Sequence, residues 1–417
     1  MHTQIQTPDP SPDMLAGLLN APVDEKQLYG PTPARFYILF AFCLLSFNQC
    51  LFWITFSPIA SNAKLYYGID DATIALLMNW GPIIYIPVCF GTSWLTAQKN
   101  GLRRVCVASA VVTAVFMVIR CVPSFQAGHV DSIGPLNTWQ LFCLHSAQIV
   151  NAAVGPPVMA SPSLLSAQWF PDDERNRATA AAILANNFGA AIGFVLPGWL
   201  NVRSPAAVPI LLYAEAGLAV VTMLMVLAYF PAAPARQPSR SALLKQNEPP
   251  PPFFSGLLNC MKNPHFFLLA AAGGSLNGVF NTWSGSFDQV LPPLDPVATC
   301  AAHPNGLSHT LTNGTIVVDM PPCEIYSQDT CGWIGFVATL AVITGGFLGG
   351  STADTYLSPR RAMKSFIVAM CVLMVLAQAY FTFALPSALL ETPPFPSTPA
   401  TIIGGIVAGN HPSYLIS

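Results

Sequence analysis

The chain has 417 residues, of which 53% are hydrophobic and only 9% are charged, and its formal net charge is −2. Soluble domains carry about 25% charged residues, so this composition excludes an ordinary water-soluble protein. Apolar runs longer than about 18 residues recur along the chain, and this length is typical of helices that cross a membrane.

Residues 1–34 are polar and rich in proline, which breaks helices because it lacks a backbone N–H. We therefore expect a disordered tail without the apolar core of a cleavable signal peptide. Within it, the pair Leu18 and Leu19 follows Asp13 with one residue more than in an acidic dileucine sorting signal. The segment fits either a sorting signal or a short apolar patch.

Six apolar segments follow the tail and predict a first bundle of membrane helices over residues 35–230. Their ranges are 36–59, 72–95, 105–122, 136–165, 178–199 and 208–230. Residues 231–263 form a proline-rich linker. Residues 264–417 contain three more expected spans, over 264–287, 332–352 and 362–385, and a polar loop over 288–330.

The final apolar run, residues 400–409, is shorter than the ~20 residues that a membrane-spanning helix needs. The second half is therefore predicted to be an incomplete bundle, so that the chain has about nine spans and a stub. Such a chain would transport weakly by itself, or it would be a truncated membrane protein that does not transport.

Basic residues are unevenly distributed and predict the orientation. With alternating spans, one side of the membrane receives only Lys64, Arg120 and Arg203, and the remaining basic residues fall on the other side. Because basic loops stay in the cytosol, we expect the N-terminus and the linker there and the loop 288–330 on the lumenal side. The glycosylation acceptor Asn313 lies in this loop, in the sequence Asn-Gly-Thr.

The same loop region contains cysteines and histidines. Cys300, Cys323 and Cys331 allow one disulfide on the oxidising side, and the spacing does not decide the pair. Together with His303 and His309 they match no standard pattern of metal ligands, so we expect neither a metal nor a cofactor.

Charged motifs mark three of the expected cytosolic loops. Arg103 and Arg104 follow the second span, Asp173, Glu174 and Arg175 precede the fifth, and Asp354 follows the eighth. Charges at helix ends brace neighbouring helices, so we interpret these residues as structural and gating parts. Six spans, a long linker and further spans, with base-rich loops of this kind, resemble the major facilitator superfamily.

A closer resemblance is carried by short blocks in conserved order along the chain. They include Trp53, Trp80-Gly81-Pro82-Ile83, Leu212-Tyr213-Ala214-Glu215, Trp283-Ser284-Gly285 and Gly332-Trp333-Ile334-Gly335-Phe336. Over residues 35–385 the chain is similar to solute carrier family 49. The resemblance implies proton-coupled export of pyridoxine, a form of vitamin B6, from lysosomes, while other members are associated with choline, ethanolamine and haem. The long loop 288–330, the shifted leucine pair and the early end depart from that family.

Polar and aromatic side chains within the spans are the candidates for contact with a solute. They are Asn48, Gln49, Trp53, Trp80, Gln148, Asn151, Asn277, Phe280 and Trp283. Aromatic rings stack on a flat heteroaromatic solute while amides bind its hydroxyls, and the same rings hold a quaternary ammonium by cation–π attraction. These residue types therefore suit pyridoxine and choline alike.

Ionisable side chains are rare within the spans, where a charge is costly unless it faces protein or water. Glu215 in the sixth span and Asp288 at the outer end of the seventh are the candidates for proton coupling. An apolar surround disfavours the carboxylate of Glu215, which would then take up a proton on the acidic side and release it to the cytosol. The alternative is a structural pair of Glu215 with Arg120 or with a tyrosine hydroxyl.

Pairs of glycines four residues apart occur in the fifth and eighth spans, at Gly189 and Gly193 and at Gly345 and Gly349. Small residues at this spacing let helices approach closely. They form either a sliding interface between the two halves or ordinary contacts within one bundle.

These features predict an all-α carrier of a small polar solute and protons in the lysosomal membrane, with the plasma membrane less favoured. A choline-like, ethanolamine-like or haem-related facilitative carrier is the alternative within transport. No nucleophile–base constellation or phosphate loop points to an enzyme, nothing points to nucleic acid, and the sequence identifies no protein partner.

Overall fold

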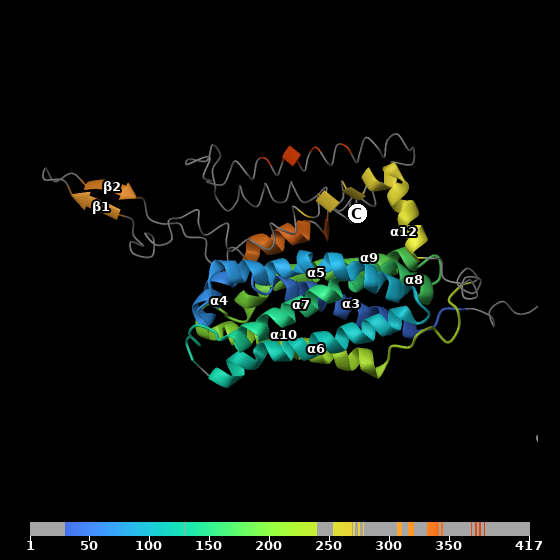
Figure 1. The fold of residues 1–417 in the computed structure, drawn as a ribbon, viewed down its shortest axis with the longest axis horizontal. Helices are drawn as coiled ribbons and strands as arrows, with labels where there is room; N and C mark the ends of the chain where they lie inside the picture. The colour runs from blue at the N-terminus through green and yellow to red at the C-terminus, as the bar shows by residue number, and fades with distance from the viewer. Residues whose placement is uncertain are drawn as a thin grey trace, which may run out of the picture.

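The computed structural model describes residues 30–128, 130–239 and 253–268, the segment 332–341, the backbone of two short strands, and scattered single positions after residue 269. Six long helices run side by side in an elongated bundle (Figure 1). They are α3 (Ala34–Ile54), α5 (Asp71–Ala97), α6 (Gly101–Ala127), α7 (Thr138–Ala160), α9 (Arg175–Trp199) and α10 (Val208–Ala228).

Most of these helices have the length and hydropathy of membrane spans. Among the described residues, five helical segments are long and apolar enough to cross a membrane: α3, α5, α6, α9 and Pro205–Ala228. Helix α7 is also 23 residues long, but it includes polar side chains such as Gln148 and Asn151. The shorter elements are α4 (Ala60–Tyr67), α8 (Pro162–Trp169), the 3-10 turn η1 (Pro205–Ala207) and α12 (Phe253–Lys262).

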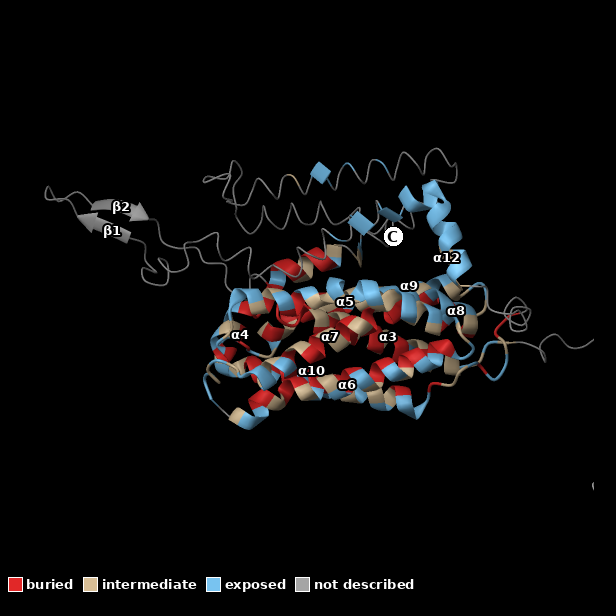
Figure 2. Cartoon of the chain, viewed as in Figure 1, coloured by how far each residue is buried: buried red, intermediate tan, exposed pale blue. Residues whose placement is uncertain are grey.

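Helix α3 occupies the interior of the bundle. It packs most extensively against α9 and also contacts α7 and α10, while α5 packs on α7 and α6 packs on both α7 and α10. Buried residues lie mainly on the sides of the helices that face the interior of the bundle, and exposed residues lie mainly on the outer sides (Figure 2). Two apolar clusters result, one around Phe52, Phe56 and Leu212 and the other around Phe42 and Trp169.

Two of the predicted spans end earlier than expected, in both cases next to a proline. The first was expected over 36–59, but α3 ends at Ile54, and a turn leads through Pro58 into α4. The fourth was expected over 136–165, but α7 ends at Ala160, and α8 begins with Pro162. Proline cannot donate the backbone hydrogen bond that would continue a helix, yet it suits the first helical position.

The glycines of the fifth span pack within the first bundle. A Cβ atom added to Gly189 would lie 2.1 Å from the Phe47 carbonyl oxygen, and one added to Gly193 would lie 2.2 Å from Ile54 Cγ2. Both neighbours belong to α3, so these two residues match the second of the two alternatives, ordinary contacts within one bundle. Their missing side chains allow the close approach of α3 and α9. Gly345 and Gly349 lie outside the described residues.

Beyond the bundle, the structure describes two further features of the second half. The loop expected over 288–330 contains an antiparallel hairpin of β1 (Leu307–Thr310) and β2 (Ile316–Met320), with His309 opposite Val317. The helix Gly332–Ala341 marks the start of the expected eighth span. It approaches α9 closely, because a Cβ added to Gly332 would lie 2.4 Å from the Phe194 carbonyl oxygen.

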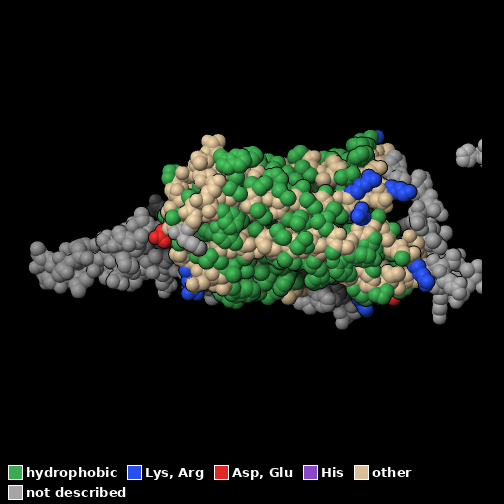
Figure 3. Space-filling view, turned by 90° about the horizontal axis from the view of Figure 1, so that it is seen from below, with side chains coloured by type: hydrophobic (Ala, Val, Ile, Leu, Met, Phe, Trp, Pro, Cys, Tyr) green, Lys and Arg blue, Asp and Glu red, His purple; other side chains and the backbone are tan. Residues whose placement is uncertain are grey.

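The surface of the bundle is mainly apolar along its length. Figure 3 shows apolar side chains covering the visible face, with the visible Lys and Arg side chains gathered towards the ends of the molecule. A wide apolar belt between charged ends is the surface that a lipid bilayer requires.

Candidate functional site

Polar side chains from three helices meet in the C-terminal half of α3, around Gln49. Asn151 on α7 donates a hydrogen bond from Nδ2 to the Gln49 backbone oxygen, at 3.0 Å. Asn186 on α9 donates from its Nδ2 to Gln49 Oε1, at 3.1 Å, and to the Ser46 backbone oxygen, at 2.9 Å. Gly155 on α7 makes room for this cluster, because a Cβ there would lie 3.2 Å from Gln49 Nε2. The structure thus brings two predicted residues together, with Asn186 as a third.

Several buried amide oxygens in this region have no hydrogen-bond partner in the described structure: Asn48 Oδ1, Gln148 Oε1 and Asn151 Oδ1. A buried acceptor without a donor costs roughly 1–3 kcal/mol. The oxygens of Gln148 and Asn151 on α7 are two such acceptors. Asn48 differs, since its Nδ2 donates to Thr222 Oγ1 on α10, at 2.6 Å, and this contact joins α3 to α10.

Trp53 has a structural contact that its residue type did not predict. Its indole Nε1 donates to the Met78 backbone oxygen on α5, at 3.3 Å. Met78 lies four residues before Pro82, which has no N–H to offer that oxygen, so Trp53 supplies the missing donor. The ring lies so near α5 that a Cβ on Gly81 would be 2.7 Å from Trp53 Nε1. Trp53 is half-buried at the junction of α3 and α5.

Trp80 also uses its indole nitrogen within the protein. Its Nε1 donates to Nδ1 of His145 on α7, at 2.9 Å, and the two rings meet edge to face with centroids 6.1 Å apart. His145 and Asn186 were not among the predicted solute contacts. The signal that could have found them is the one used for the others, a polar side chain within an apolar span.

Glu215 is enclosed between three helices. Both of its carboxylate oxygens accept from Thr55 Oγ1 on α3, at 2.9 Å, and Oε2 also accepts from Arg120 on α6. Both ionic side chains are buried, at 0% and 1% exposure. The Arg120 guanidinium also lies over the ring of Phe56, 5.9 Å from its centre. The structure therefore contains the pair with Arg120, one of the two structural partners considered for Glu215.

The charged loop residues connect the ends of different helices. Glu174, before α9, binds Arg35 at the start of α3 through two contacts of 3.1 and 3.2 Å. Arg175 pairs with Asp172 at 2.5 Å. Arg103, near the start of α6, donates to the backbone oxygen of Phe230 beyond the end of α10, at 2.8 Å. Arg104 and Asp173 are exposed.

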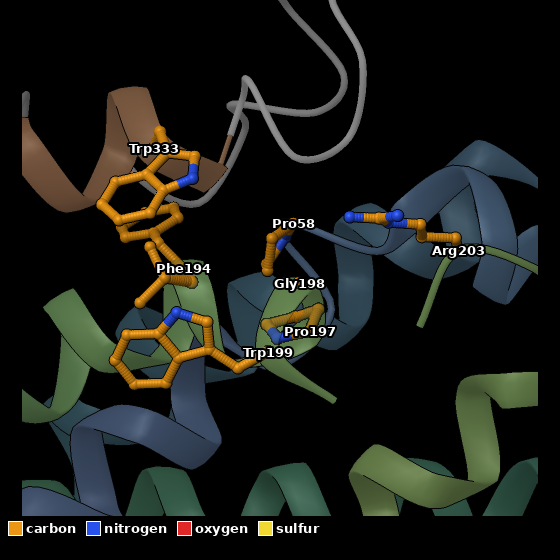
Figure 4. Close-up of a pocket in the computed structure, with 8 residues that line it drawn as sticks. Pro58, Phe194, Pro197, Gly198, Trp199, Arg203 and Trp333 are labelled. Carbon is orange, nitrogen blue, oxygen red and sulfur yellow. The ribbon is translucent and has the colours of Figure 1, made fainter. Parts of the chain in front are cut away.

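A cavity of about 150 Å³ lies away from the predicted solute contacts, at the far end of α9. Trp199 and Phe194 of α9 and Trp333 of the second half lie on one side of it, and Arg203 lies across from them (Figure 4). Pro58, after α3, also lines it. None of the predicted solute contacts lines this cavity, which is bounded by the two halves where Trp333 approaches α9.

The remaining predicted site residues lie outside the described part of the chain. They are Asn277, Phe280, Trp283, Asp288, Asn313 and Asp354. The loop cysteines Cys300, Cys323 and Cys331 lie outside it as well. Among the residues that are described, no group of three His, Cys, Asp or Glu side chains could hold a metal ion.

Comparison with known proteins identifies the class of this bundle. The family model of the Major Facilitator Superfamily matches residues 38–302. The chain is 27% identical to the solute carrier family 49 member 4 homolog of Xenopus tropicalis, over 91% of this chain and 77% of that protein. It is 26% identical to the choline/ethanolamine transporter FLVCR1 of Felis catus, over 76% of this chain and 59% of that protein.

A solved structure supports the fold. The partially occluded inward-open form of the xylose transporter XylE from E. coli superposes with a TM-score of 0.56 and 12% sequence identity, over 93% of this chain and 83% of that one. The predicted all-α fold class and the predicted resemblance to solute carrier family 49 are therefore confirmed. The chain is a multi-pass membrane protein that belongs to the Major Facilitator Superfamily of transporters.

Proposed function

We propose that this protein carries a small, flat, polar organic solute across a membrane and binds it beside Gln49, Trp53 and Asn151. The observation that carries the proposal is the meeting of polar groups from α3, α7 and α9 inside an apolar bundle. Two buried amide oxygens there lack donors, and an indole ring lies within the same part of α3. Polar groups placed at this depth in a membrane are costly unless they serve a polar ligand or pathway.

Pyridoxine is the favoured solute, and a choline-like cation is the alternative. Pyridoxine has a flat aromatic ring with three hydroxyl groups, so it supplies both a stacking face and donors for the oxygens of Gln148 and Asn151. The quaternary ammonium of choline has no N–H, and it relies on aromatic faces instead. The relative named as a choline/ethanolamine transporter keeps the alternative open. The unpaired amide oxygens favour the solute with more donors.

The decisive experiment is solute binding to the purified protein with two variants. Trp53→Ala removes an aromatic face, so we expect weaker binding of either solute by about 1–3 kcal/mol. Trp53→Phe keeps an aromatic ring but loses the N–H that donates to the Met78 backbone oxygen. Comparison of the two variants therefore separates stacking on the solute from the hydrogen bond between α3 and α5. Trp94→Ala is the matched control, because this tryptophan is 45% exposed near the end of α5.

Gln148→Leu distinguishes the two solutes. Loss of one hydrogen bond should weaken pyridoxine binding by about 1 kcal/mol, which is roughly fivefold in Kd, and should weaken the binding of choline, which has one hydroxyl donor instead of three, less. If choline but not pyridoxine competes for the binding site, the protein is a carrier of choline-like cations. If neither solute binds the unaltered protein, both substrate assignments fail.

We further propose that the carrier works in the lysosomal membrane with the N-terminus in the cytosol, and that protons drive it. Lysosomal location and proton drive rest on the resemblance to solute carrier family 49. The orientation rests on the basic residues at the starts of α3, α6 and α9, among them Arg35, Arg103 and Arg175. Glu215 and Asp288 stay candidates for the proton site, with the ion pair to Arg120 supporting a structural role for Glu215.

A further inference from the structure

The contact between Trp80 and His145 joins α5 to α7 beside the proposed solute site. Trp80 stands next to Gly81, which abuts the ring of Trp53, and two residues after Met78, which accepts the Trp53 hydrogen bond. On α7, His145 lies three residues before Gln148, so the two side chains are neighbours on the helix surface. Both members of the pair are half-buried.

The hydrogen bond from Trp80 requires that His145 is neutral. Trp80 Nε1 is only a donor, so His145 Nδ1 must accept, and the proton of the neutral imidazole resides on Nε2. A second proton would bind at Nδ1. The imidazolium and the indole would then point two N–H groups at each other, so the contact cannot survive protonation of His145.

We propose that His145 is the group through which protons act on solute binding, and that Trp80 is its positioning residue. In the neutral state Trp80 holds His145 and ties α5 to α7. Uptake of a proton at Nδ1 breaks the hydrogen bond between α5, which also holds the Trp53 ring through Met78, and α7, which carries Gln148 and Asn151, and so alters the wall of the solute site. This inference rests on the proposed proton-driven function and names a site for its protons.

Several other titratable side chains lie on the helices around His145. The titratable side chains on the helices packed against α7 are Arg35, Tyr37, Cys43 and Cys50 on α3, Asp71, Tyr85 and Cys89 on α5, and Arg103, Arg104, Cys106, Arg120 and Cys121 on α6. Among the described contacts, the partner of His145 is the Trp80 indole. Glu215 is in a different situation from His145, because its carboxylate already accepts hydrogen bonds from Arg120 and Thr55.

The test uses two substitutions that separate the proton from the contact. In His145→Asn, the amide oxygen takes the place of Nδ1 as acceptor but does not titrate. In Trp80→Phe, the ring remains and the donor is lost. His265→Asn is the matched control, because this histidine is exposed and follows α12 in the chain.

The first measurement is tryptophan fluorescence of the purified full chain between about pH 5 and 8, where histidine titrates. A charged imidazole quenches a neighbouring indole, so the unaltered protein and His265→Asn should show a step in this range. The step should be absent in His145→Asn and in Trp80→Phe. A step that persists in His145→Asn would overturn the assignment.

The second measurement is the pH response of solute uptake in liposomes. His145→Asn should lose the pH response of uptake. In Trp80→Phe the response should persist with its midpoint nearer to neutral pH, because the neutral imidazole has lost its donor. An unchanged response in His145→Asn would refute the inference. Failure of the unaltered protein to take up any tested solute would count against the proposed function, while the fluorescence step still decides the proton site.

Discussion

Among the ion pairs in the described part of the chain, Arg120 and Glu215 are the most completely buried, at 0% and 1% exposure. Removing one partner of a buried pair leaves a charge without compensation and costs about 3–5 kcal/mol, whereas an apolar replacement of both partners is often neutral. The pair connects α6 to α10, and Thr55 extends the connection to the end of α3. The contribution of the ion pair to stability can be measured by thermal unfolding, and any role in proton coupling can be measured by the pH response of uptake.

We expect Glu215→Gln to lower the midpoint of thermal unfolding and to leave the pH response of uptake intact. The physical reason is that Arg120 keeps its charge while its counter-ion is lost. The double variant Arg120→Met with Glu215→Leu should be more stable than the single one. Normal stability of Glu215→Gln together with loss of the pH response would instead assign proton coupling to Glu215.

The polar side chains of the site could be predicted from the sequence, but their partners could not. Gln49, Asn151 and Trp53 were identified because polar and indole groups are unusual in apolar spans. Helices that are apolar on all sides give little periodicity, so the sequence does not tell which face meets which neighbour. That is why the contact of Asn186 with Gln49 and that of Trp53 with Met78 became visible only in the structure.

Among the helices, prolines also show that tertiary contacts could not be predicted from the sequence. Pro58 and Pro162 follow helix ends, whereas Pro82 and Pro87 lie inside the continuous helix α5. The residue type is the same, and the difference is tertiary, since Trp53 satisfies the carbonyl that Pro82 leaves without a donor. Hydropathy located the cores of the spans, while the tertiary contact of Trp53 with Met78 accompanies the continuation of α5 through Pro82.

Helix spacing gives a prediction with an internal control. Gly189→Ala would place a methyl group against the Phe47 backbone oxygen, which cannot rotate away, so we expect a loss of about 1–3 kcal/mol in stability. Gly193→Ala should also destabilise the protein, because its methyl group would meet Ile54 Cγ2, which is attached to the branched Cβ and moves only if χ1 changes. Gly217→Ala on α10 has open space around its Cβ and should be neutral or stabilising.

Thermal unfolding of the three glycine variants in one detergent checks this prediction. Equal midpoints for Gly189→Ala and Gly217→Ala would contradict the close contact between α3 and α9.

The start of α5 provides a prediction with a pH dependence. Asp70 caps this helix, since its carboxylate accepts from the Thr73 backbone N–H at 2.9 Å and from the Thr73 hydroxyl. These hydrogen bonds lower the pKa of Asp70 from its ordinary value of 3.8. A lowered pKa gives stability that is present above the ordinary value and is lost as the pH falls through the folded value.

We therefore expect Asp70→Ala to lower the thermal midpoint at neutral and at mildly acidic pH. Asp70→Asn should be tolerated, because asparagine is an equally good cap and does not titrate. The unaltered protein should lose its advantage over Asp70→Ala only when the carboxylate is protonated. Midpoints of Asp70→Ala equal to those of the unaltered protein at neutral pH would show that the cap contributes nothing.

For the whole molecule, the distribution of charge is the property from which the orientation was predicted. Arg35, Arg103 and Arg175 lie where α3, α6 and α9 begin, and the contacts of Arg35 and Arg103 join these helix starts to their neighbours. Lys64 of α4 and Arg203 before η1 lie at the other end of the bundle. An excess of basic residues marks the cytosolic side of a membrane protein. We therefore propose that the opposite end, with the loop 288–330 that contains the β1–β2 hairpin, faces the lumen.

This orientation predicts that Asn313, between β1 and β2 in the chain, is glycosylated. Glycosidase treatment of protein from mammalian cells should increase the mobility of the unaltered chain on a gel, and Asn313→Gln should migrate at the treated position with or without enzyme. Asn305→Gln, in the same loop but outside an Asn-x-Thr sequence, is the matched control and should behave like the unaltered chain. In sealed, right-side-out lysosomes, an external protease should cut the linker 231–263 and spare the loop. Cleavage of the loop from the cytosolic side would reverse the orientation, and it would also move the acidic compartment to the other end of the bundle.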